Sequence, residues 1–198
     1  MAATEAAAIL QQRDPQLGVL IARLGEDTWP DRNPPDSLLA ALARAVLAQQ
    51  IAPKAAETIY QRFLGLFPQA SPSAEALLAL PEATLRGAGI SRPKVSYLKA
   101  LARAELPSWA ALEAMEDEAI VPSLTAVKGV GRWTVEMLLI FELQREDVWP
   151  AEDLGLAKAL QQLYGWQARP NRQQVRACGE RWCPYRSTAA RYLWRSLA

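Results

Sequence analysis

The chain has 198 residues, of which 51% are apolar and 22% charged, and its formal net charge is +1. This length suffices for one buried core, or for two small lobes that share one. No apolar run is long enough for a membrane-spanning helix, so the composition argues against a membrane protein and predicts a cytoplasmic one, associated with the nucleoid if the source is a prokaryote.

Missing residue types narrow the possible chemistry. The chain has no histidine, which removes the commonest general base, the commonest metal ligand and any Ser-His or Cys-His nucleophile pair. Carboxylates, lysines and aromatic surfaces remain. Cys178 and Cys183 are the only cysteines, and an intracellular protein is not expected to join them in a disulfide. Two thiolates are also too few for an iron–sulfur cluster, which takes four.

Helical patterns begin at the N-terminus, because apolar residues recur at intervals of three and four. The first half of the chain predicts helices at 4–12, at 15–24, from a cap at Asp36 or Ser37 to Gln49, and at 53–64. A turn-rich segment, 25–35, separates the first two helices from the others. Between Gln49 and Pro53 one helix stops and another starts, since proline fits the first turn of a helix but not its interior.

The remaining segments are also helical in pattern. Helices are predicted at 73–79, 81–86 and 91–103, after Pro107-Ser108, and near the C-terminus at 171–180 and 184–197. Apolar residues rarely alternate at intervals of two, so no strand is predicted. The sequence shows no repeat and no low-complexity linker. We therefore expect an all-α protein with a single domain over residues 1–198.

The stretch 122–143 predicts two helices joined by a tight hairpin. A short helix is expected to start at Pro122, the turn lies at Gly129-Val130-Gly131, and the second helix follows. Glycine reaches positive φ without penalty and leaves the backbone N–H groups open. Consecutive N–H groups at a helix N-terminus, with the helix dipole behind them, favour a phosphate.

Asp153 follows an aromatic and proline-containing loop and precedes the helical pattern Leu154-Gly155-Leu156. Its simplest role is that of a helix cap. The same amide hydrogen bonds and helix dipole also stabilise the charged carboxylate. Such a charge suits the cleavage of a glycosidic bond, in which the sugar becomes cationic. The residues alone leave both roles open.

The charge is unevenly distributed along the chain. From Trp166 onward there are seven arginines against Glu180 alone, a net charge of +6, and the remainder carries −5. A charge run by itself is usually a solvated face. Beside a phosphate-binding hairpin, it favours a surface that binds a nucleic-acid backbone.

Three segments together resemble a known family: Lys128-Gly129-Val130-Gly131-Arg132-Trp133-Thr134, Asp153-Leu154-Gly155-Leu156, and Pro184-Tyr185-Arg186-Ser187 with Tyr192-Leu193-Trp194. They are similar to the helix-hairpin-helix DNA glycosylase superfamily and to its 3-methyladenine DNA glycosylase II branch. The resemblance covers roughly residues 37–194. It implies an all-α helix-hairpin-helix glycosylase fold with two helical lobes and an active site in the cleft between them. The extra N-terminal sheet domain of larger bacterial relatives is not expected.

The resemblance assigns catalytic and base-binding roles. Asp153 is implied to be the catalytic carboxylate, and the implied base pocket contains Trp133, Met137, Leu154 and Trp194. Trp133 also stands where bifunctional relatives carry a Schiff-base lysine, which implies a monofunctional enzyme. As a helical aromatic residue, it is equally consistent with a place in the core. Met137 replaces a tyrosine of the best-known relatives, which bears on the shape of the pocket.

The resemblance also implies a DNA-binding set: Gln50, Ile51, Lys128, Gly129, Val130, Gly131, Arg132 and Thr134. Gln50 aligns with the wedge that fills the gap left by a flipped nucleotide, although Gln49 and Gln50 would also serve simply to end a helix. The backbone carbonyls of Thr125, Val127 and Val130 match those that hold a structural monovalent cation in DNA-bound relatives. No other cofactor is expected.

The expected function is therefore excision of alkylated purines, such as 3-methyladenine and 7-methylguanine, by a monofunctional DNA glycosylase in base excision repair. The expected partner is double-stranded DNA containing damaged bases, bound by a monomer. Two alternatives remain: a glycosylase for another base lesion, and a non-catalytic module that clamps DNA with the hairpin. Base release by the wild-type protein and by an Asp153→Asn variant would discriminate them.

Overall fold

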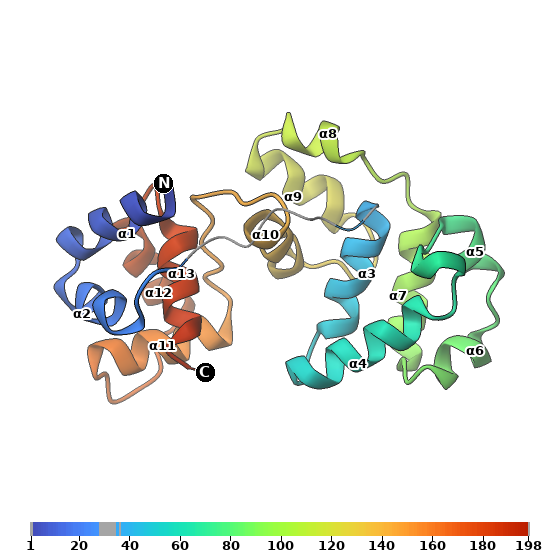
Figure 1. Cartoon of the computed structure of the whole chain (residues 1–198), viewed down its shortest axis with the longest axis horizontal. Helices are drawn as coiled ribbons and strands as arrows, with labels where there is room; N and C mark the ends of the chain where they lie inside the picture. Colours follow the sequence, from blue (N-terminus) through green and yellow to red (C-terminus); the bar gives the residue numbers. More distant parts are fainter. Residues whose placement is uncertain (1, 28–34, 36, 198) are drawn as a thin grey trace. The chain divides into compact units, whose positions relative to one another are not determined.

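The computed structural model describes residues 2–27, 35 and 37–197. These residues form thirteen α-helices, one short 3₁₀ helix and no strand (Figure 1), which confirms the all-α prediction. The elements are α1 (Ala2–Arg13), α2 (Pro15–Leu24), α3 (Leu38–Ala48), α4 (Pro53–Leu64), η1 (Pro68–Ala70), α5 (Ala74–Ala79), α6 (Glu82–Gly87), α7 (Arg92–Arg103), α8 (Trp109–Glu113), α9 (Asp117–Thr125), α10 (Arg132–Phe141), α11 (Leu154–Tyr164), α12 (Arg172–Glu180) and α13 (Arg186–Arg195). Within the described ranges, no helix has both the length and the apolar character needed to cross a membrane.

The chain divides into two compact units. The first unit combines residues 1–32 with 139–198, so that the blue helices α1 and α2 of Figure 1 belong with the orange and red helices α11 to α13. The second unit holds residues 33–138. The boundary between residues 32 and 33 falls in the turn-rich segment 25–35, but the boundary between residues 138 and 139 falls inside α10, where the sequence pattern marks no division.

The first unit packs α1 and α2 against α11 and α13. Its core includes Leu10 of α1, Leu17 of α2, Leu160 of α11 and Tyr192 of α13, all fully or almost fully buried. Asp14 caps α2, the helix predicted at 15–24, because its carboxylate accepts hydrogen bonds from the main-chain N–H groups of the first helical turn at 3.1 Å. Helices α1 and α2, together the N-terminal arm, are thus an integral part of this unit.

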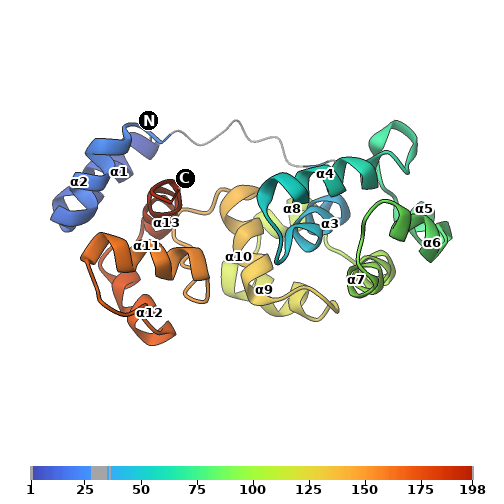
Figure 2. The same ribbon diagram turned by 90° about the horizontal axis from the view of Figure 1, so that it is seen from below.

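The second unit is centred on α3, whose residues Leu38 to Ala43, Val46 and Leu47 are all buried. A helix that is apolar on nearly every side needs neighbours on every side. Helices α4 and α7 pack against it, and α5 and α6 pack on α7. Helices α9 and α10 lie side by side in both views (Figures 1 and 2) and carry the hairpin between them.

One predicted helix start is wrong. Helix α9 begins at Asp117, not at Pro122, which lies inside the helix. Two influences favour the earlier start. Asp117 and Glu118 place negative charge in the first turn, where the helix dipole favours it, and the helix buries Ile120 and Val121 before the proline as well as Leu124 after it. This burial outweighs the missing proline N–H.

Other predicted boundaries agree with the structure to within a few residues. Ser37 caps α3 by accepting a hydrogen bond from the Ala40 N–H at 3.2 Å, and the alternative cap, Asp36, lies outside the described residues. The helix predicted at 91–103 is α7, and the one predicted at 171–180 is α12, which starts with a capping box at Asn171. These boundaries follow from local capping and proline chemistry, which the sequence displays directly.

Candidate active site

Asp153 is the N-cap of α11, as the sequence predicted. Its Oδ1 accepts a hydrogen bond from the main-chain N–H of Leu156 at 2.6 Å. The Asp153 N–H donates to the Pro150 carbonyl at 2.9 Å, which closes a tight turn just before the helix. The carboxylate therefore lies at the positive end of the α11 dipole, on a main chain fixed from both sides.

Trp194 of α13 is the second partner of this carboxylate. Its indole Nε1 donates a hydrogen bond to Asp153 Oδ1 at 2.9 Å. Gly155 leaves room for this contact, because a Cβ atom there would lie 3.1 Å from Oδ1 and 3.5 Å from Trp194 Cδ1. The structure thus joins two residues that lie 41 positions apart in the sequence and that the resemblance assigned to one site.

Phe141 extends this group and was missed by the sequence analysis. Its ring stacks on Trp194 with 5.8 Å between ring centroids and an interplanar angle of 28°, and it is 46% exposed. Leu154, beside the carboxylate in sequence, is 70% exposed. Large apolar side chains this accessible, next to a fixed carboxylate, suit a flat apolar ligand. The spacing by four from Trp133 through Met137 to Phe141 could have indicated Phe141.

The loop that leads to Asp153 is anchored on the start of α13. Asp147 accepts two hydrogen bonds from the Arg186 guanidinium, at 2.7 and 2.9 Å. This pairing raises the pKa of Arg186. The buried hydroxyl of Ser187 accepts from the Val148 N–H at 2.9 Å, and the Ser187 N–H donates to the Glu146 carbonyl. Helix α13 therefore fixes the loop through Arg186 and Ser187 at its N-terminal end, and Asp153 through Trp194 near its C-terminal end.

The hairpin between α9 and α10 has two glycines with different roles. Gly129 has φ of 92°, and a Cβ there would lie 2.2 Å from Cγ of Tyr97, so the main chain rests directly on that ring. At Gly131, a Cβ would meet no atom within 4 Å. Gly131 precedes α10, so the open space lies where a phosphate would approach the helix N-terminus.

The side chains around the hairpin differ in their availability. Lys128 is exposed and donates a hydrogen bond to the Ser96 hydroxyl at 3.2 Å. Arg132 is ion-paired with Glu118 and Glu136, and the hydrogen bond to Glu118 raises its pKa. Thr134 is 2% exposed. Its hydroxyl accepts a hydrogen bond from Gln49 Nε2 at 3.2 Å, so the side chain is engaged within the protein.

The corner between α3 and α4 carries the predicted wedge. Gln50 is exposed and has φ of 58°, a conformation that residues other than glycine seldom adopt. Ile51, also predicted to contact DNA, is 37% exposed. The preceding residue, Gln49, does more than end a helix. Its Nε2 donates to the Gly129 carbonyl at 3.0 Å and to the Thr134 hydroxyl at 3.2 Å.

Lys94, to which the sequence analysis gave no role, also holds this corner. Its Nζ donates to the carbonyls of Leu47 and Gln49 at 2.7 and 2.8 Å, and burial lowers its pKa.

The predicted basic flank needs correction, because most of its arginines are paired within the protein. Arg181 pairs with Asp14, Arg186 with Asp147, Arg172 with Glu152, and both Arg191 and Arg195 with Asp27. In the described part of the chain, no carboxylate pairs with Arg169 or Arg176. Most of these arginines therefore bind the N-terminal arm and the loop before Asp153. Because the carboxylates neutralise them, the positive charge available to a nucleic-acid backbone is much smaller than the number of arginines suggests.

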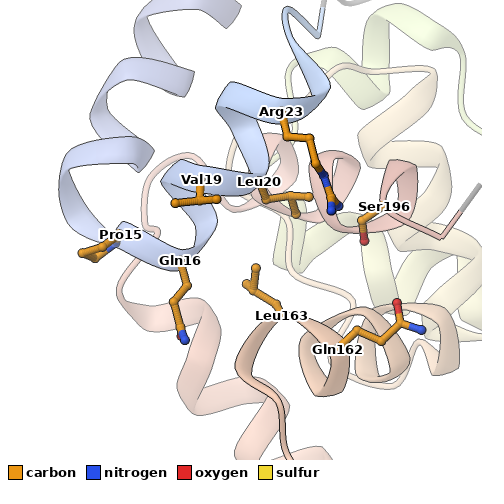
Figure 3. A pocket seen from close by; sticks show the side chains of 8 residues that line it. All are labelled: Pro15, Gln16, Val19, Leu20, Arg23, Gln162, Leu163 and Ser196. Atoms are coloured by element: carbon orange, nitrogen blue, oxygen red, sulfur yellow. The ribbon is translucent and has the colours of Figure 1, made fainter.

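A cavity of about 600 Å³ in the first unit lies elsewhere (Figure 3). Val19 and Leu20 of α2 line one side and Leu163 of α11 the other. Asp153 caps the opposite end of α11, which is about 16 Å long at 1.5 Å per residue. This cavity is therefore separate from the carboxylate site.

The carbonyls named for a structural cation are in part engaged. Val127 O accepts from the Val130 N–H at 3.0 Å. A carbonyl oxygen has two lone pairs, so this turn is compatible with one further contact to a cation. Among the described residues, no group of three or more His, Cys, Asp or Glu side chains could hold a metal ion.

Trp133 and Met137 are half-buried and lie one turn apart on α10. Trp133 and Met137 belong to the second unit, and Asp153, Leu154 and Trp194 to the first. In the first unit the structure brings Asp153 together with Trp194. In the second unit it brings Gln49, at the corner between α3 and α4, together with the hairpin.

Comparison with known proteins identifies the family to which the chain is similar. Residues 43–185 match the model of the HhH-GPD superfamily of base excision DNA repair proteins. DNA-3-methyladenine glycosylase 1 of Schizosaccharomyces pombe is 37% identical over 160 residues, covering 78% of this chain and 70% of the relative. The structure of a 3-methyladenine DNA glycosylase from the same yeast, in complex with abasic DNA, superposes with a TM-score of 0.91 at 33% identity, covering 97% of this chain and 96% of that one. A DNA-3-methyladenine glycosidase from Bacillus halodurans gives a TM-score of 0.80 at 30% identity, covering 96% and 88%.

Proposed function

This chain belongs to the HhH-GPD superfamily of base excision DNA repair proteins, and from that premise we propose that it is a monofunctional DNA glycosylase that excises alkylated purines. One observation carries the proposal: the Asp153 carboxylate is held at a helix N-terminus and hydrogen-bonded to the indole of Trp194 at 2.9 Å. The names of the relatives, which are 3-methyladenine glycosylases, support the same assignment.

Asp153 would stabilise the cationic sugar. As the bond between C1′ and the base nitrogen breaks, its electron pair leaves with the base and positive charge grows on the sugar ring. A fixed negative charge beside that ring stabilises the transition state. A water molecule then attacks C1′, and Asp153 orients it or accepts its proton. Because Asp153 is already oriented by Leu156 and Trp194, little reorganisation accompanies the reaction.

The aromatic side chains would bind the extruded base. Phe141 and Trp194 stack on one another and Phe141 is accessible, so a planar base would have an aromatic surface next to the carboxylate. A cationic base gains about 0.5 to 2 kcal/mol from such a face. We include Leu154, which adjoins Asp153 in sequence and is exposed, in the pocket.

A site with one carboxylate and an aromatic surface, but no general acid, can release purines that are already cationic. A purine alkylated at N3 or N7 carries a positive charge and departs as a neutral base, whereas a neutral purine needs protonation on leaving. The chain has no histidine, and the nearest alternative acid in sequence, Glu152, is ion-paired with Arg172 at 2.6 Å. We therefore propose 3-methyladenine and 7-methylguanine as substrates.

DNA would be held by the second unit. Gly131 and the N–H groups at the start of α10 would receive a phosphate, with Lys128 as an exposed cation nearby in sequence. Gln50 and Ile51 would enter the duplex where the base has left the stack. A monovalent cation on the carbonyls of Thr125, Val127 and Val130 would bridge the hairpin to a phosphate. We propose that the protein acts as a monomer.

The assignment is tested with duplex DNA methylated by a simple methylating agent. We expect chromatography to find free 3-methyladenine and 7-methylguanine, and borohydride to trap no covalent protein–DNA adduct, because Trp133 stands where the Schiff-base lysine would be. If the protein binds this DNA but releases no base, the clamp-module alternative holds. If borohydride traps an adduct, the chain contains a nucleophile that this assignment lacks.

A further inference from the structure

The main chain at Gln50 adopts an unusual conformation that needs external support. Its φ of 58° lies in the left-handed region, where the Cβ atom crowds the main chain, so such residues persist when their surroundings fix them. The peptide group between Gln49 and Gln50 sets this conformation, and the Gln49 carbonyl is part of that group. Any contact that fixes this carbonyl also fixes the direction in which Gln50 leaves the corner.

Lys94 makes that contact. Its Nζ donates to the Gln49 carbonyl at 2.8 Å and to the Leu47 carbonyl at 2.7 Å. The first bond holds the peptide plane that precedes Gln50, and the second ties this plane to the last turn of α3. A charged donor is suited to this task, since hydrogen bonds from an ionised group are stronger than neutral ones.

The side chain of Gln49 continues the link to the hairpin. Its Nε2 donates to the Gly129 carbonyl at 3.0 Å, and Gly129 itself rests on the Tyr97 ring. Lys94 and Tyr97 are three residues apart on α7 and so share one side of that helix. Helix α7 thus supports the corner through Lys94 and the hairpin through Tyr97.

We propose that Lys94 and Gln49 are positioning residues that couple phosphate binding at the hairpin to the entry of Gln50 into the duplex. The inference rests on the function proposed above, in which Gln50 acts as the wedge. It implies that these two residues influence lesion recognition through the orientation of Gln50, beyond their contribution to folding.

The chain offers a matched control for Lys94. Lys99, also on α7, donates to the carbonyls of Leu77, Leu78 and Leu80 at 2.7 to 2.9 Å and so holds the end of α5. Lys94→Met and Lys99→Met remove the same kind of interaction from the same helix, but only the first lies at the corner. Thermal unfolding of both variants measures the purely structural cost.

The experiment compares binding to two duplexes, one undamaged and one with a tetrahydrofuran abasic-site analogue flanked by 2-aminopurine. We expect Lys94→Met to lower the preference for the abasic duplex and the 2-aminopurine fluorescence change by about tenfold, as for coupled residues. Lys99→Met should leave both within about twofold, the scatter of uncoupled sites. Gln49→Met, which loses the amide donor, should act as Lys94→Met does.

A double-mutant cycle with Gln50 decides whether the coupling is real. If Lys94 acts through Gln50, the variant Lys94→Met with Gln50→Ala should lose no more preference than Gln50→Ala alone. Losses that multiply, or equal effects of Lys94→Met and Lys99→Met, overturn the coupling. If Gln50→Ala itself leaves the preference unchanged while wild type releases base, Gln50 is no wedge and the inference fails with it. Absence of base release by wild type would instead reject the proposed function.

Discussion

The Asp153→Asn variant should fold like the wild-type protein and release alkylated purines about 10² to 10⁴ times more slowly, the range seen when a group of this kind is lost. Asparagine caps helices about as well as aspartate, so the N-terminus of α11 should persist. The amide oxygen can still accept from Leu156 and Trp194. Only the negative charge beside the sugar disappears. Single-turnover release of 7-methylguanine, with the unfolding temperature measured in parallel, tests this result.

Asp14→Asn provides the control for this substitution, since Asp14 also caps a helix. Asp14 additionally accepts a hydrogen bond from the Tyr164 hydroxyl at 2.5 Å and pairs with Arg181. We expect this change to lower the unfolding temperature. At temperatures where the variant is folded, the release rate should be nearly the same as that of the wild-type protein. Equal release by wild type and Asp153→Asn would show that the carboxylate is only a cap.

The two hairpin glycines should respond oppositely to alanine. Gly129→Ala should destabilise the protein by about 3 kcal/mol, because the new Cβ both overlaps the Tyr97 ring and occupies a strained φ. Gly131→Ala should leave stability nearly unchanged, since its Cβ meets nothing within 4 Å. It should instead weaken binding to duplex DNA about tenfold by obstructing a charged hydrogen bond to phosphate. Thermal unfolding and DNA titration of both variants separate the two effects.

Tyr97→Ala refines this comparison. Combined with Gly129→Ala, it removes the ring contacts but keeps both the strained φ and the Cβ atom of residue 97, which lies 2.5 Å from the new Cβ. It should therefore restore only a small part of the lost stability, less the cost of emptying the Tyr97 site. If the Gly131→Ala variant binds DNA with unaltered affinity, no phosphate binds at the N-terminus of α10. That outcome would place the principal phosphate contacts elsewhere in the protein.

Local chemistry explains what the sequence predicted well. Asp153 and Ser37 cap their helices as expected, because an acceptor before a run of helix formers acts over only three residues. The rule that proline starts a helix failed at Pro122, because apolar side chains on both sides of it are buried and the helix continues through it.

Long-range pairing explains what the sequence concealed. Arg181, Arg191 and Arg195 seemed available to DNA because their partners, Asp14 and Asp27, lie more than 150 positions away. No motif marked Lys94, and only the helical spacing from Trp133 and Met137 pointed to Phe141, since the contacts of Lys94 with Gln49 and of Phe141 with Trp194 are made only in the folded chain. The family resemblance located Asp153 and Trp194, and the structure supplied the hydrogen bond between them.

We propose that one charged carboxylate, with no protonating partner, suffices to release bases that are already cationic. The most direct measurement is single-turnover release from matched duplexes that differ only in one base: 7-methylguanine, 3-methyladenine, hypoxanthine or 1,N6-ethenoadenine. We predict that the two cationic bases are released faster, and that release of the neutral bases is slow or absent. Faster release of hypoxanthine or 1,N6-ethenoadenine would contradict the claim and would require an acid, such as Glu152 or a tyrosine, to protonate the leaving base.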